Sequence, residues 1–346
     1  GGVRAARMAA GKGKRVAIAE ERYLGGTCVN VGCVPKKLFV YASQFPELFH
    51  ASQGFGWQVG QMPRLDWKTL RDNKSAEIAR LNSIYNNLIA NSGAELFDGR
   101  ATVVGPHKVS VAGVTYSARH ILIAVGGWPY IPEFPGSEHA LSSNEMFFLD
   151  ALPKSAVVVG GGYIAVEFAG ILNGLGVETH LVYRGPRLLK SFDAEMTAKV
   201  TEGMAAKGIH IHLSSDVDEI TKTADGLRVA LADKAAIDTQ LVLYATGRRA
   251  NTSGLGLDTT GAVLRADGSI VVDDQFATAD PSIYALGDVI DRVQLTPVAI
   301  QEAMVLVDHL YGDGTARIDY SDIPTAVFCQ PEFGTVGLSE EQARAE

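Results

Sequence analysis

Cysteines and long apolar runs are scarce in this chain of 346 residues. Three cysteines are too few for a disulfide framework, which favours a reducing compartment, and we expect the cytoplasm. No apolar run approaches the roughly 20 residues that cross a bilayer, and no signal peptide is visible, so we expect no membrane association. The net charge of −8 argues against nucleic acid as the main partner.

What the chain has instead is glycine and apolar residues. Hydrophobic residues make up 47% of the chain and there are 37 glycines, which fits an α/β protein with many tight loops and room for two or three domains. The chain opens on Gly1-Gly2 with no preceding strand and stops inside a helix predicted from Ser339 onward. We therefore expect it to be truncated at both ends.

Two of the cysteines, Cys28 and Cys33, stand with four residues between them on a glycine-rich segment that leads into a predicted helix. This spacing can place the sulfurs on adjoining turns of a helix start, close enough for a disulfide. The helix N-terminus and the following Lys36 and Lys37 favour thiolate over thiol. The alternatives are two unrelated buried thiols or half of a zinc site. Zinc needs four ligands, and Cys329 is the only other cysteine. The pattern favours a redox pair.

The first 20 residues are typical of the second half of a dinucleotide-binding βαβ unit. Gly1-Gly2 opens a predicted helix over Val3 to Ala10, and a predicted strand over Val16 to Ala19 ends on Glu20. In such units an acid about 20 residues after the glycine motif accepts hydrogen bonds from ribose hydroxyls. We expect Glu20 to do so.

The same unit recurs later in the chain. A predicted strand, Val157 to Val159, leads into Gly160-Gly161-Gly162-Tyr163-Ile164-Ala165, which fits G-x-G-x-x-A. A predicted helix over Val166 to Leu175 and a strand over Thr179 to Tyr183 complete it. The chain therefore carries two predicted dinucleotide sites.

The two copies differ where the acid should stand. At the position of Glu20 the second copy has Tyr183, followed by Arg184 and, further on, Lys190. Cations suit a ribose that carries a 2′-phosphate, whereas a carboxylate would repel it. The alternative is an ordinary solvated loop, which the missing acid makes less favourable. We predict NADP(H) at the second site.

Two later features point to a further cofactor. A predicted strand over Ile283 to Ala285 runs into Gly287-Asp288, whose carboxylate can bind ribityl hydroxyls, and a helix begins near Thr296, where negative charge on a ring is stabilised. Nicotinamide transfers electrons in pairs and a disulfide accepts two, so two dinucleotide sites and one dithiol imply a flavin between them.

These residues resemble the class I pyridine nucleotide–disulfide oxidoreductases, and among them most closely the glutathione reductases. The resemblance covers nearly the whole chain and rests on five motifs: Gly-Gly-Thr-Cys-Val-Asn-Val-Gly-Cys-Val-Pro-Lys-Lys at 25–37, Gly-Gly-Gly-Tyr-Ile-Ala-Val-Glu at 160–167, Ala-Thr-Gly-Arg at 245–248, Tyr-Ala-Leu-Gly-Asp at 284–288 and Leu-Thr-Pro-Val-Ala at 295–299.

The resemblance implies an α/β fold with two Rossmann-like dinucleotide-binding domains of the three-layer ββα type and the start of an α+β dimerisation domain. We expect a discontinuous FAD-binding domain at 1–126 and 251–318, an NADPH-binding domain at 127–250, and the beginning of the interface domain at 319–346. The implied activity is NADPH-dependent reduction of glutathione disulfide, which maintains thiol redox balance.

The resemblance also assigns the catalytic residues. Cys28 resembles the thiol that attacks the substrate disulfide, and Cys33 the thiol that lies against the flavin. Lys36 is expected near the flavin, paired with Glu167, because a buried lysine needs a counter-ion. Tyr163 is expected to be a lid over the nicotinamide pocket.

The cofactor residues follow by position. For FAD the resemblance implies Gly1, Gly2, Glu20, Gly26, Thr27, Lys36, Ala101, Gly126, Gly287, Asp288 and Thr296. For NADPH it implies Gly160, Gly162, Tyr163, Ile164, Ala165, Glu167, Arg184, Lys190, Gly247 and Arg248. No metal is expected.

For the substrate, Arg7 and Tyr85 match positions that contact glutathione disulfide, and Arg4 adds positive charge nearby. These arginines have the wrong sign for trypanothione, which carries a cationic linker. Met304 departs from the pattern, because some glutathione reductases have an arginine there. Cys329 is expected to be a buried structural thiol.

The family's acid–base histidine belongs to the interface domain and serves the other subunit of a homodimer, and no histidine here matches that motif. Two alternatives stay open. One is a related reductase of the trypanothione or thioredoxin type. The other is a nucleotide-binding fragment without turnover of its own.

Overall fold

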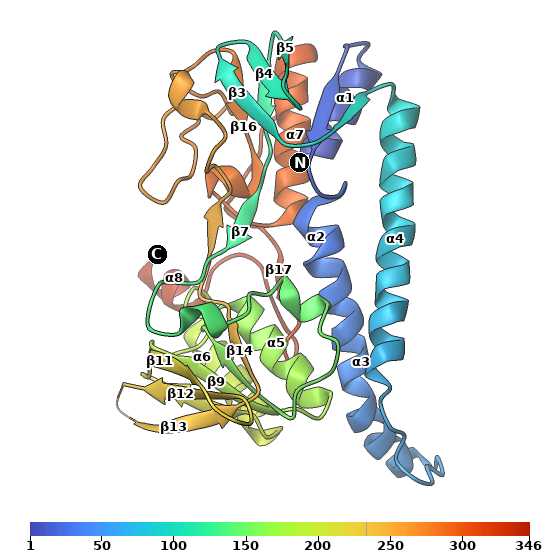
Figure 1. Ribbon diagram of the computed structural model, residues 1–346, viewed down its shortest axis with the longest axis vertical. Helices are drawn as coiled ribbons and strands as arrows, with labels where there is room; N and C mark the ends of the chain where they lie inside the picture. The colour runs from blue at the N-terminus through green and yellow to red at the C-terminus, as the bar shows by residue number, and fades with distance from the viewer. Residues whose placement is uncertain (233) are drawn as a thin grey trace. The chain divides into compact units, whose positions relative to one another are not determined.

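The computed structural model describes residues 1–232 and 234–346 (Figure 1). Its contacts divide the chain into two compact units. Unit 1 consists of Gly1–Asn30, Glu77–Trp128 and Arg248–Tyr320, and unit 2 of Val31–Ala76, Pro129–Gly247 and Ser321–Glu346. Residues 31–76 thus belong to the same unit as the second glycine motif. The predicted domains are defined by the cofactor that each binds, and contacts within the chain do not identify a cofactor. The predicted domain division therefore stays a prediction.

A parallel sheet with strand order β10-β9-β8-β14 forms the centre of unit 2. Its strands are β8 (Ser155–Val159), β9 (Glu178–Tyr183), β10 (His210–Leu213) and β14 (Leu241–Tyr244). They are rich in Val, Leu and Ile, and β8 and β14 are almost wholly buried, as expected for strands covered on two faces. Helix α5 (Tyr163–Gly174) crosses from β8 to β9, which gives the predicted βαβ unit.

The two faces of this sheet carry different layers. Val157, Val159 and Val182 pack with residues of an antiparallel meander, β11 (Val217–Lys222), β12 (Leu227–Leu231) and β13 (Lys234–Thr239). Because side chains alternate along a strand, Ala156 and Val158 point to the other face, and α5 packs against β8 and β9. Meander, sheet and helix make the three layers that the ββα class predicts, so that prediction is confirmed.

Helix α3 (Cys33–Ser52) packs closely on α5 within unit 2. At Gly174 a side chain would lie 2.4 Å from the carbonyl oxygen of Ser43, so only glycine allows this approach. The ring of Phe147 contacts Phe39 of α3 and Phe168 of α5, with centroids 5.8 and 5.5 Å apart. The N-terminal turns of α3 are therefore held beside the residues of α5 that follow the glycine motif.

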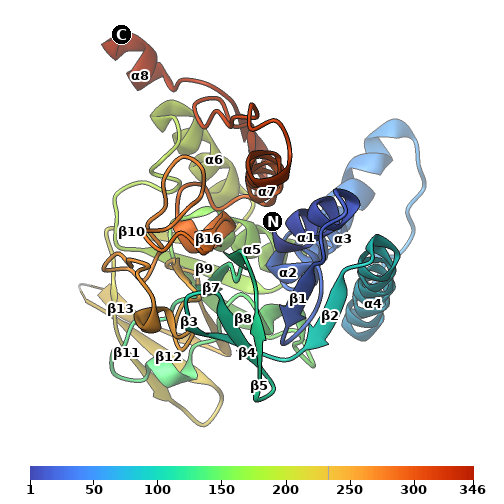
Figure 2. The same cartoon turned by 90° about the horizontal axis from the view of Figure 1, so that it is seen from above.

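In unit 1, α1 (Gly2–Gly11) and α7 (Thr296–Tyr311) lie side by side (Figures 1 and 2). Two parallel pairs accompany them, β1 (Ala17–Glu20) with β2 (Glu95–Asp98), and β6 (Ile121–Ile123) with β16 (Ile283–Ala285). The core gathers Ala5 and Ala9 of α1 with the apolar residues of β6, β16 and α7.

The other elements complete the outline. An antiparallel ribbon consists of β3 (Ala101–Gly105), β4 (Lys108–Val111) and β5 (Val114–Ser117). The further helices are α2 (Gly26–Asn30), α4 (Trp67–Ser92), α6 (Ala194–Ala206) and α8 (Glu340–Ala345). The further strands are β7 (Gly127–Pro129), β15 (Arg248–Ala250), β17 (Thr325–Val327) and β18 (Phe333–Thr335). Among the described residues, no helix is both long enough and apolar enough to cross a membrane.

Candidate functional site

The loop before Cys28 has a fixed backbone. Gly25 and Gly26 have φ of 98° and 66°, in the left-handed region that favours glycine. The buried Asn30 amide donates to the carbonyl oxygens of Leu24 and Gly26 at 3.1 and 3.0 Å, and its own oxygen accepts from Asn82 at 2.8 Å. Asn30 was not predicted as a site residue, although it lies inside the cysteine motif. It acts here by fixing the turn that leads into α2.

The two cysteines lie on successive helices. Cys28 is half-buried in α2 of unit 1, and Cys33 is exposed at the first position of α3 in unit 2. The first turn of α3 holds no acidic residue, so the partial positive charge of the helix start is not cancelled at Cys33. The disulfide between them stays a prediction.

Lys36 and Glu167 form a buried ion pair in unit 2, with Nζ to Oε1 at 2.7 Å and side chains 12% and 3% exposed. The same oxygen accepts the backbone N–H of Phe328 at 2.8 Å. The Phe328 ring lies 4.3 Å from the Lys36 Nζ and 4.1 Å from that of Lys37, as in cation–π contacts.

Burial raises the pKa of Glu167, and Lys36 and the Phe328 N–H offset part of that rise. The pair is therefore present as predicted, and its part in catalysis stays a prediction. The hydrogen bond from Phe328 was missed because its donor is a backbone N–H, which no residue type signals.

The glycine loop of unit 2 contains one glycine that packing requires and one that it does not. A side chain at Gly160, where φ is 143°, would lie 2.4 Å from the Ala245 carbonyl oxygen. A side chain at the exposed Gly162 would meet nothing within 4 Å. Open space over Gly162, at the start of α5, suits the close approach of a pyrophosphate to a helix N-terminus.

Three other predicted residues extend this loop. Tyr163 is the first residue of α5 and its side chain is 40% exposed, Ile164 is half-buried, and Ala165 is fully buried. Tyr163 therefore has the exposure that a lid requires, and Ala165 has the small size that close helix–sheet packing requires.

The segment after β9 is tied to the glycine loop. The backbone N–H of Leu189 donates to the carbonyl of Gly161 at 2.7 Å, so the chain from 184 to 190 turns back toward the loop. Arg184 and Lys190 are exposed, while Leu188 and Leu189 are buried and anchor the turn. Two exposed cations thus stand on a segment that a backbone hydrogen bond ties to the glycine loop, and cations on this segment suit a 2′-phosphate.

Tyr183, which replaces the acid, packs against glycine backbone. A side chain at Gly161 or Gly185 would lie 2.5 or 2.6 Å from the Tyr183 ring. The ring thus lies between two backbone segments, and the position that carries the acid in the first copy carries an uncharged side chain here. Gly247, also predicted here, is exposed with φ of 154°.

In unit 1, Glu20 ends β1 as predicted. Its Oε1 accepts the backbone N–H groups of Arg22 and Tyr23 at 3.0 and 3.3 Å, which orients the carboxylate at the strand end. Side chains at Gly26 and Gly126, both with positive φ, would meet nothing within 4 Å. Open backbone of this kind suits a bound cofactor. Thr27 follows in α2, and Ala101 begins β3, both half-buried.

The glycines at the start of α1 are closely packed. A side chain at Gly1 would lie 2.2 Å from Leu286, and one at Gly2 would lie 3.1 Å from Ala124. Glycine there lets α1 approach the strand ends, as expected for a nucleotide-binding turn.

Gly287 is held by a buried carboxylate. Its N–H donates to Oε2 of Glu302 at 2.7 Å, and the Tyr320 hydroxyl donates to Oε1 at 2.8 Å. Glu302 is fully buried, and burial raises its pKa, with these two hydrogen bonds as the main offsets. Glu302 was missed because an acid inside a helical apolar pattern carries no motif. Thr296 begins the same helix, α7.

Asp288 and Arg248, predicted for different cofactors, form an ion pair of 3.4 Å within unit 1. The Arg248 side chain is 8% exposed and also donates to the Gly127 carbonyl at 2.5 Å. Its charge is therefore engaged inside unit 1. That Arg248 contacts the nicotinamide nucleotide stays a prediction.

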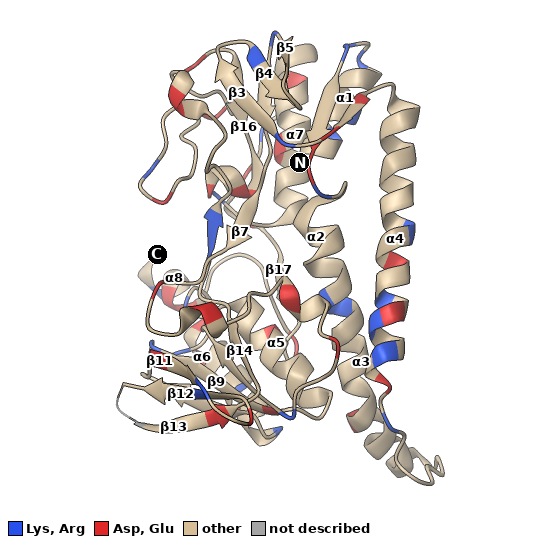
Figure 3. Ribbon diagram, in the orientation of Figure 1, with Lys and Arg blue, Asp and Glu red and all other residues tan. Residues whose placement is uncertain are grey.

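The predicted substrate residues lie on two helices of unit 1. Arg7 is half-buried on α1, with Arg4 exposed one turn earlier. Tyr85, on α4, packs against the cluster of Leu24, Ile89 and Ala94, as does Val3 of α1. The charged residues of α4 lie between Lys68 and Arg80, and the part around Tyr85 carries none (Figure 3). Of these two helix segments, only that of α1 carries positive charge, and the contact of Arg7 and Tyr85 with a substrate stays a prediction.

Cys329 is fully buried, as predicted for a structural thiol, and burial raises its pKa to about 12.

Comparison with known proteins defines the class. The sequence pattern of the pyridine nucleotide-disulphide oxidoreductase family matches residues 1–303. The chain belongs to this family. Membership implies a flavin and a nicotinamide nucleotide as the classes of cofactor, which agrees with the open glycine loops and exposed cations described above.

Two individual relatives show which members of the family the chain resembles. The chain is 46% identical over 354 residues to the chloroplastic/mitochondrial glutathione reductase of Pisum sativum and 45% identical over 344 residues to the glutathione reductase of Burkholderia cepacia, and each match covers 99% of this chain. It spans 64% and 76% of the length of these relatives. The predicted resemblance to glutathione reductases is confirmed.

The fold matches a solved structure over its whole length. The HOCl-induced flavoprotein disulfide reductase RclA from Escherichia coli superposes with a TM-score of 0.90 at 26% identity, covering 100% of this chain and 77% of RclA.

Proposed function

We propose that the protein reduces glutathione disulfide with electrons from NADPH, through FAD and a Cys28–Cys33 disulfide. The observation that carries the proposal is the Cys28–Cys33 motif, whose second cysteine begins α3 one turn before Lys36 of the buried Lys36–Glu167 pair. It stands in a chain 45% identical over 99% of its length to a protein named glutathione reductase. The proposal includes a homodimer, as the family resemblance implies, and a cytoplasmic location.

NADPH is proposed over NADH because of the segment after β9. Arg184 and Lys190 are exposed there and Tyr183 replaces the acid. FAD is proposed for unit 1, where Glu20 ends β1 and where the space beside the backbone of Gly26 and of Gly126 is open. We assign the adenosine ribose to Glu20, the ribityl chain to Asp288 and the ring edge to Thr296.

A bound flavin would supply the chemistry that turns a hydride into two electrons for the disulfide. Once Cys28 and Cys33 are thiolates, Cys28 attacks one sulfur of glutathione disulfide, forms a mixed disulfide and releases one glutathione thiolate. Cys33 then attacks the sulfur of Cys28, re-forms the internal disulfide and releases the second thiolate. Each leaving thiolate takes a proton, from a histidine of the other subunit in this proposal.

Lys36 and Glu167 act in this scheme by position and charge. The ammonium of Lys36 is held one turn after Cys33 by a carboxylate that is 3% exposed. A fixed cation at the start of α3 favours the anionic form of nearby groups without the rearrangement that solvent would need.

The test uses Cys28→Ser in the full-length natural protein. We expect no reduction of glutathione disulfide, while NADPH still reduces the flavin in an anaerobic titration. Cys329→Ser is the matched control, because it also removes one thiol and should keep turnover. Turnover of glutathione disulfide by Cys28→Ser would overturn the assignment. Faster turnover of trypanothione disulfide or thioredoxin by the wild type would move the substrate to one of those alternatives.

A further inference from the structure

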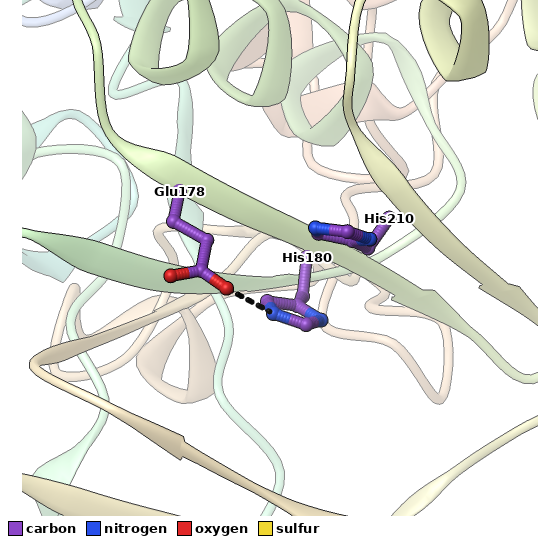
Figure 4. A group of neighbouring side chains, drawn as sticks. All are labelled: Glu178, His180 and His210. Atoms are coloured by element: carbon purple, nitrogen blue, oxygen red, sulfur yellow. Dashed lines mark ion pairs between the residues drawn. The ribbon is translucent and has the colours of Figure 1, made fainter.

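Unit 2 carries a cluster of imidazoles outside the predicted redox site (Figure 4). Glu178 and His180 lie on β9, and His210 is the register partner of His180 on the edge strand β10. Potential ligand atoms of these three residues all lie within 4.8 Å of one another. Among the residues that the structure describes, this is the one group of three or more His, Cys, Asp or Glu side chains with such spacing. We call it the β9–β10 cluster.

His180 is the central member of the cluster. Its Nε2 lies 3.7 Å from Oε1 of Glu178, and its ring stacks on that of His210 with centroids 4.7 Å apart. Its other nitrogen, Nδ1, lies 3.1 Å from Nε2 of His212. A proton on Nδ1 donated to His212 would leave the Nε2 lone pair directed to the side of Glu178. Histidine ligands of metals are commonly oriented in this way by a second hydrogen bond.

We propose that Glu178, His180 and His210 bind one divalent transition-metal ion, with His212 as the residue that orients His180. Two imidazoles and a carboxylate suit Zn²⁺ and its neighbours Cu²⁺ and Ni²⁺ better than Mg²⁺ or Ca²⁺, which prefer oxygen ligands. Water would complete the coordination, because Glu178 and His210 are exposed.

The geometry requires a small adjustment. Bond lengths of about 2.0–2.1 Å in a tetrahedron separate two ligand atoms by about 3.4 Å. The 3.7 Å between Nε2 of His180 and Oε1 of Glu178 is near that value. The distance of 4.8 Å, within which all three ligand atoms lie, is wider than a bound ion requires. The stacked His210 ring must turn so that a nitrogen points at the ion. Its exposure and its place on an edge strand allow that rotation.

The site is independent of the redox function. Glu178 begins β9, whereas Tyr183 ends it before the predicted 2′-phosphate segment, so Glu178 lies at the opposite end of the strand from the predicted nucleotide site. An ion held there joins β9 to the edge strand β10. Bound metal should therefore stabilise unit 2 without entering the electron path.

The experiment measures Zn²⁺ binding to the oxidised, thiol-blocked holoenzyme with any purification tag removed, by competition with a chromogenic chelator. Blocking the thiols excludes zinc bound by cysteines. The variants are His180→Gln, His210→Gln and Glu178→Gln. The matched control is His139→Gln, because His139 also lies beside a carboxylate, 3.6 Å from Glu138, but in a pair to which the described residues add no third ligand.

We expect one Zn²⁺ per chain, with affinity lowered at least about 10-fold by each cluster variant and unchanged by His139→Gln. Zn²⁺ should also raise the melting temperature of the wild type, and EDTA should reverse the rise. The exposed His210 and Glu178 can be changed without disturbing the core, so these two variants carry the test if His180→Gln fails to fold. Equal Zn²⁺ affinity in wild type and His210→Gln, or no stoichiometric binding at all, would overturn the proposal.

Discussion

The buried pair of Lys36 and Glu167 allows a quantitative prediction. Glu167 is 3% exposed and Lys36 12%, so Glu167→Ala leaves an ammonium with little access to water and no counter-ion. Breaking a buried pair from one side costs about 3–5 kcal/mol, and we expect a value near the lower end because Lys36 retains some exposure. The Phe328 N–H loses its acceptor as well. Glu167→Gln can keep that hydrogen bond and should cost about half as much.

Removing both charges should cost little. In Lys36→Met/Glu167→Leu no ion remains buried, and such replacements are often close to neutral, so we expect unfolding free energy within about 1 kcal/mol of the wild type. Urea unfolding followed by circular dichroism and tryptophan fluorescence measures all four proteins. The reasoning is refuted if Glu167→Ala is no less stable than the double variant.

The same pair predicts a pH dependence. Burial raises the pKa of Glu167 and Lys36 offsets part of that rise, so Lys36→Met should raise the pKa further. A carboxyl whose pKa is raised in the folded state contributes stability at low pH and loses it as the pH rises through the folded-state value. The loss of unfolding free energy in Lys36→Met, relative to the wild type, should therefore be small at pH 5 and grow toward pH 8. A deficit that is constant over this range would contradict the assigned cause.

Further predictions concern the nucleotide loop of unit 2. Gly160→Ala should destabilise the fold by about 2–4 kcal/mol in thermal or urea unfolding, because its side chain meets a carbonyl at 2.4 Å with φ positive. Gly162→Ala, which meets nothing within 4 Å, should keep stability yet raise KM for NADPH at least about 10-fold. The double variant Arg184→Ala/Lys190→Ala should raise KM for NADPH about 10–100-fold and leave KM for NADH unchanged. The control is Arg228→Ala, which removes an exposed cation paired with Asp238 and should change neither KM. Equal losses with NADPH and NADH in steady-state assays would contradict a 2′-phosphate contact.

Much of unit 2 follows from its sequence because its signals are local. The glycine motif at 160–165 predicted β8, α5 and β9 with ends within three residues of the observed ones. The meander of β11, β12 and β13 was not among the predicted elements. Its strands alternate short apolar and polar residues without a motif, and their place is set by packing against Val157, Val159 and Val182.

The site was predictable where a motif names its residues. Lys36 and Glu167 stand 131 residues apart, and only the family resemblance joined them before the structure gave 2.7 Å. Glu302 and Phe328 escaped prediction because each contact involves a backbone N–H, that of Gly287 for Glu302 and its own for Phe328, and a backbone group leaves no trace in residue type. The β9–β10 cluster escaped because its ligands come from two strands whose register the sequence does not specify.

The central claim is that electrons from NADPH arrive at Cys28 and Cys33. Peptide mass spectrometry of the full-length holoenzyme, alkylated anaerobically before and after NADPH, tests it directly. The account predicts that both cysteines resist alkylation before NADPH, react after it, and resist again once glutathione disulfide is added. Alkylation of both cysteines to the same extent with and without NADPH would contradict it.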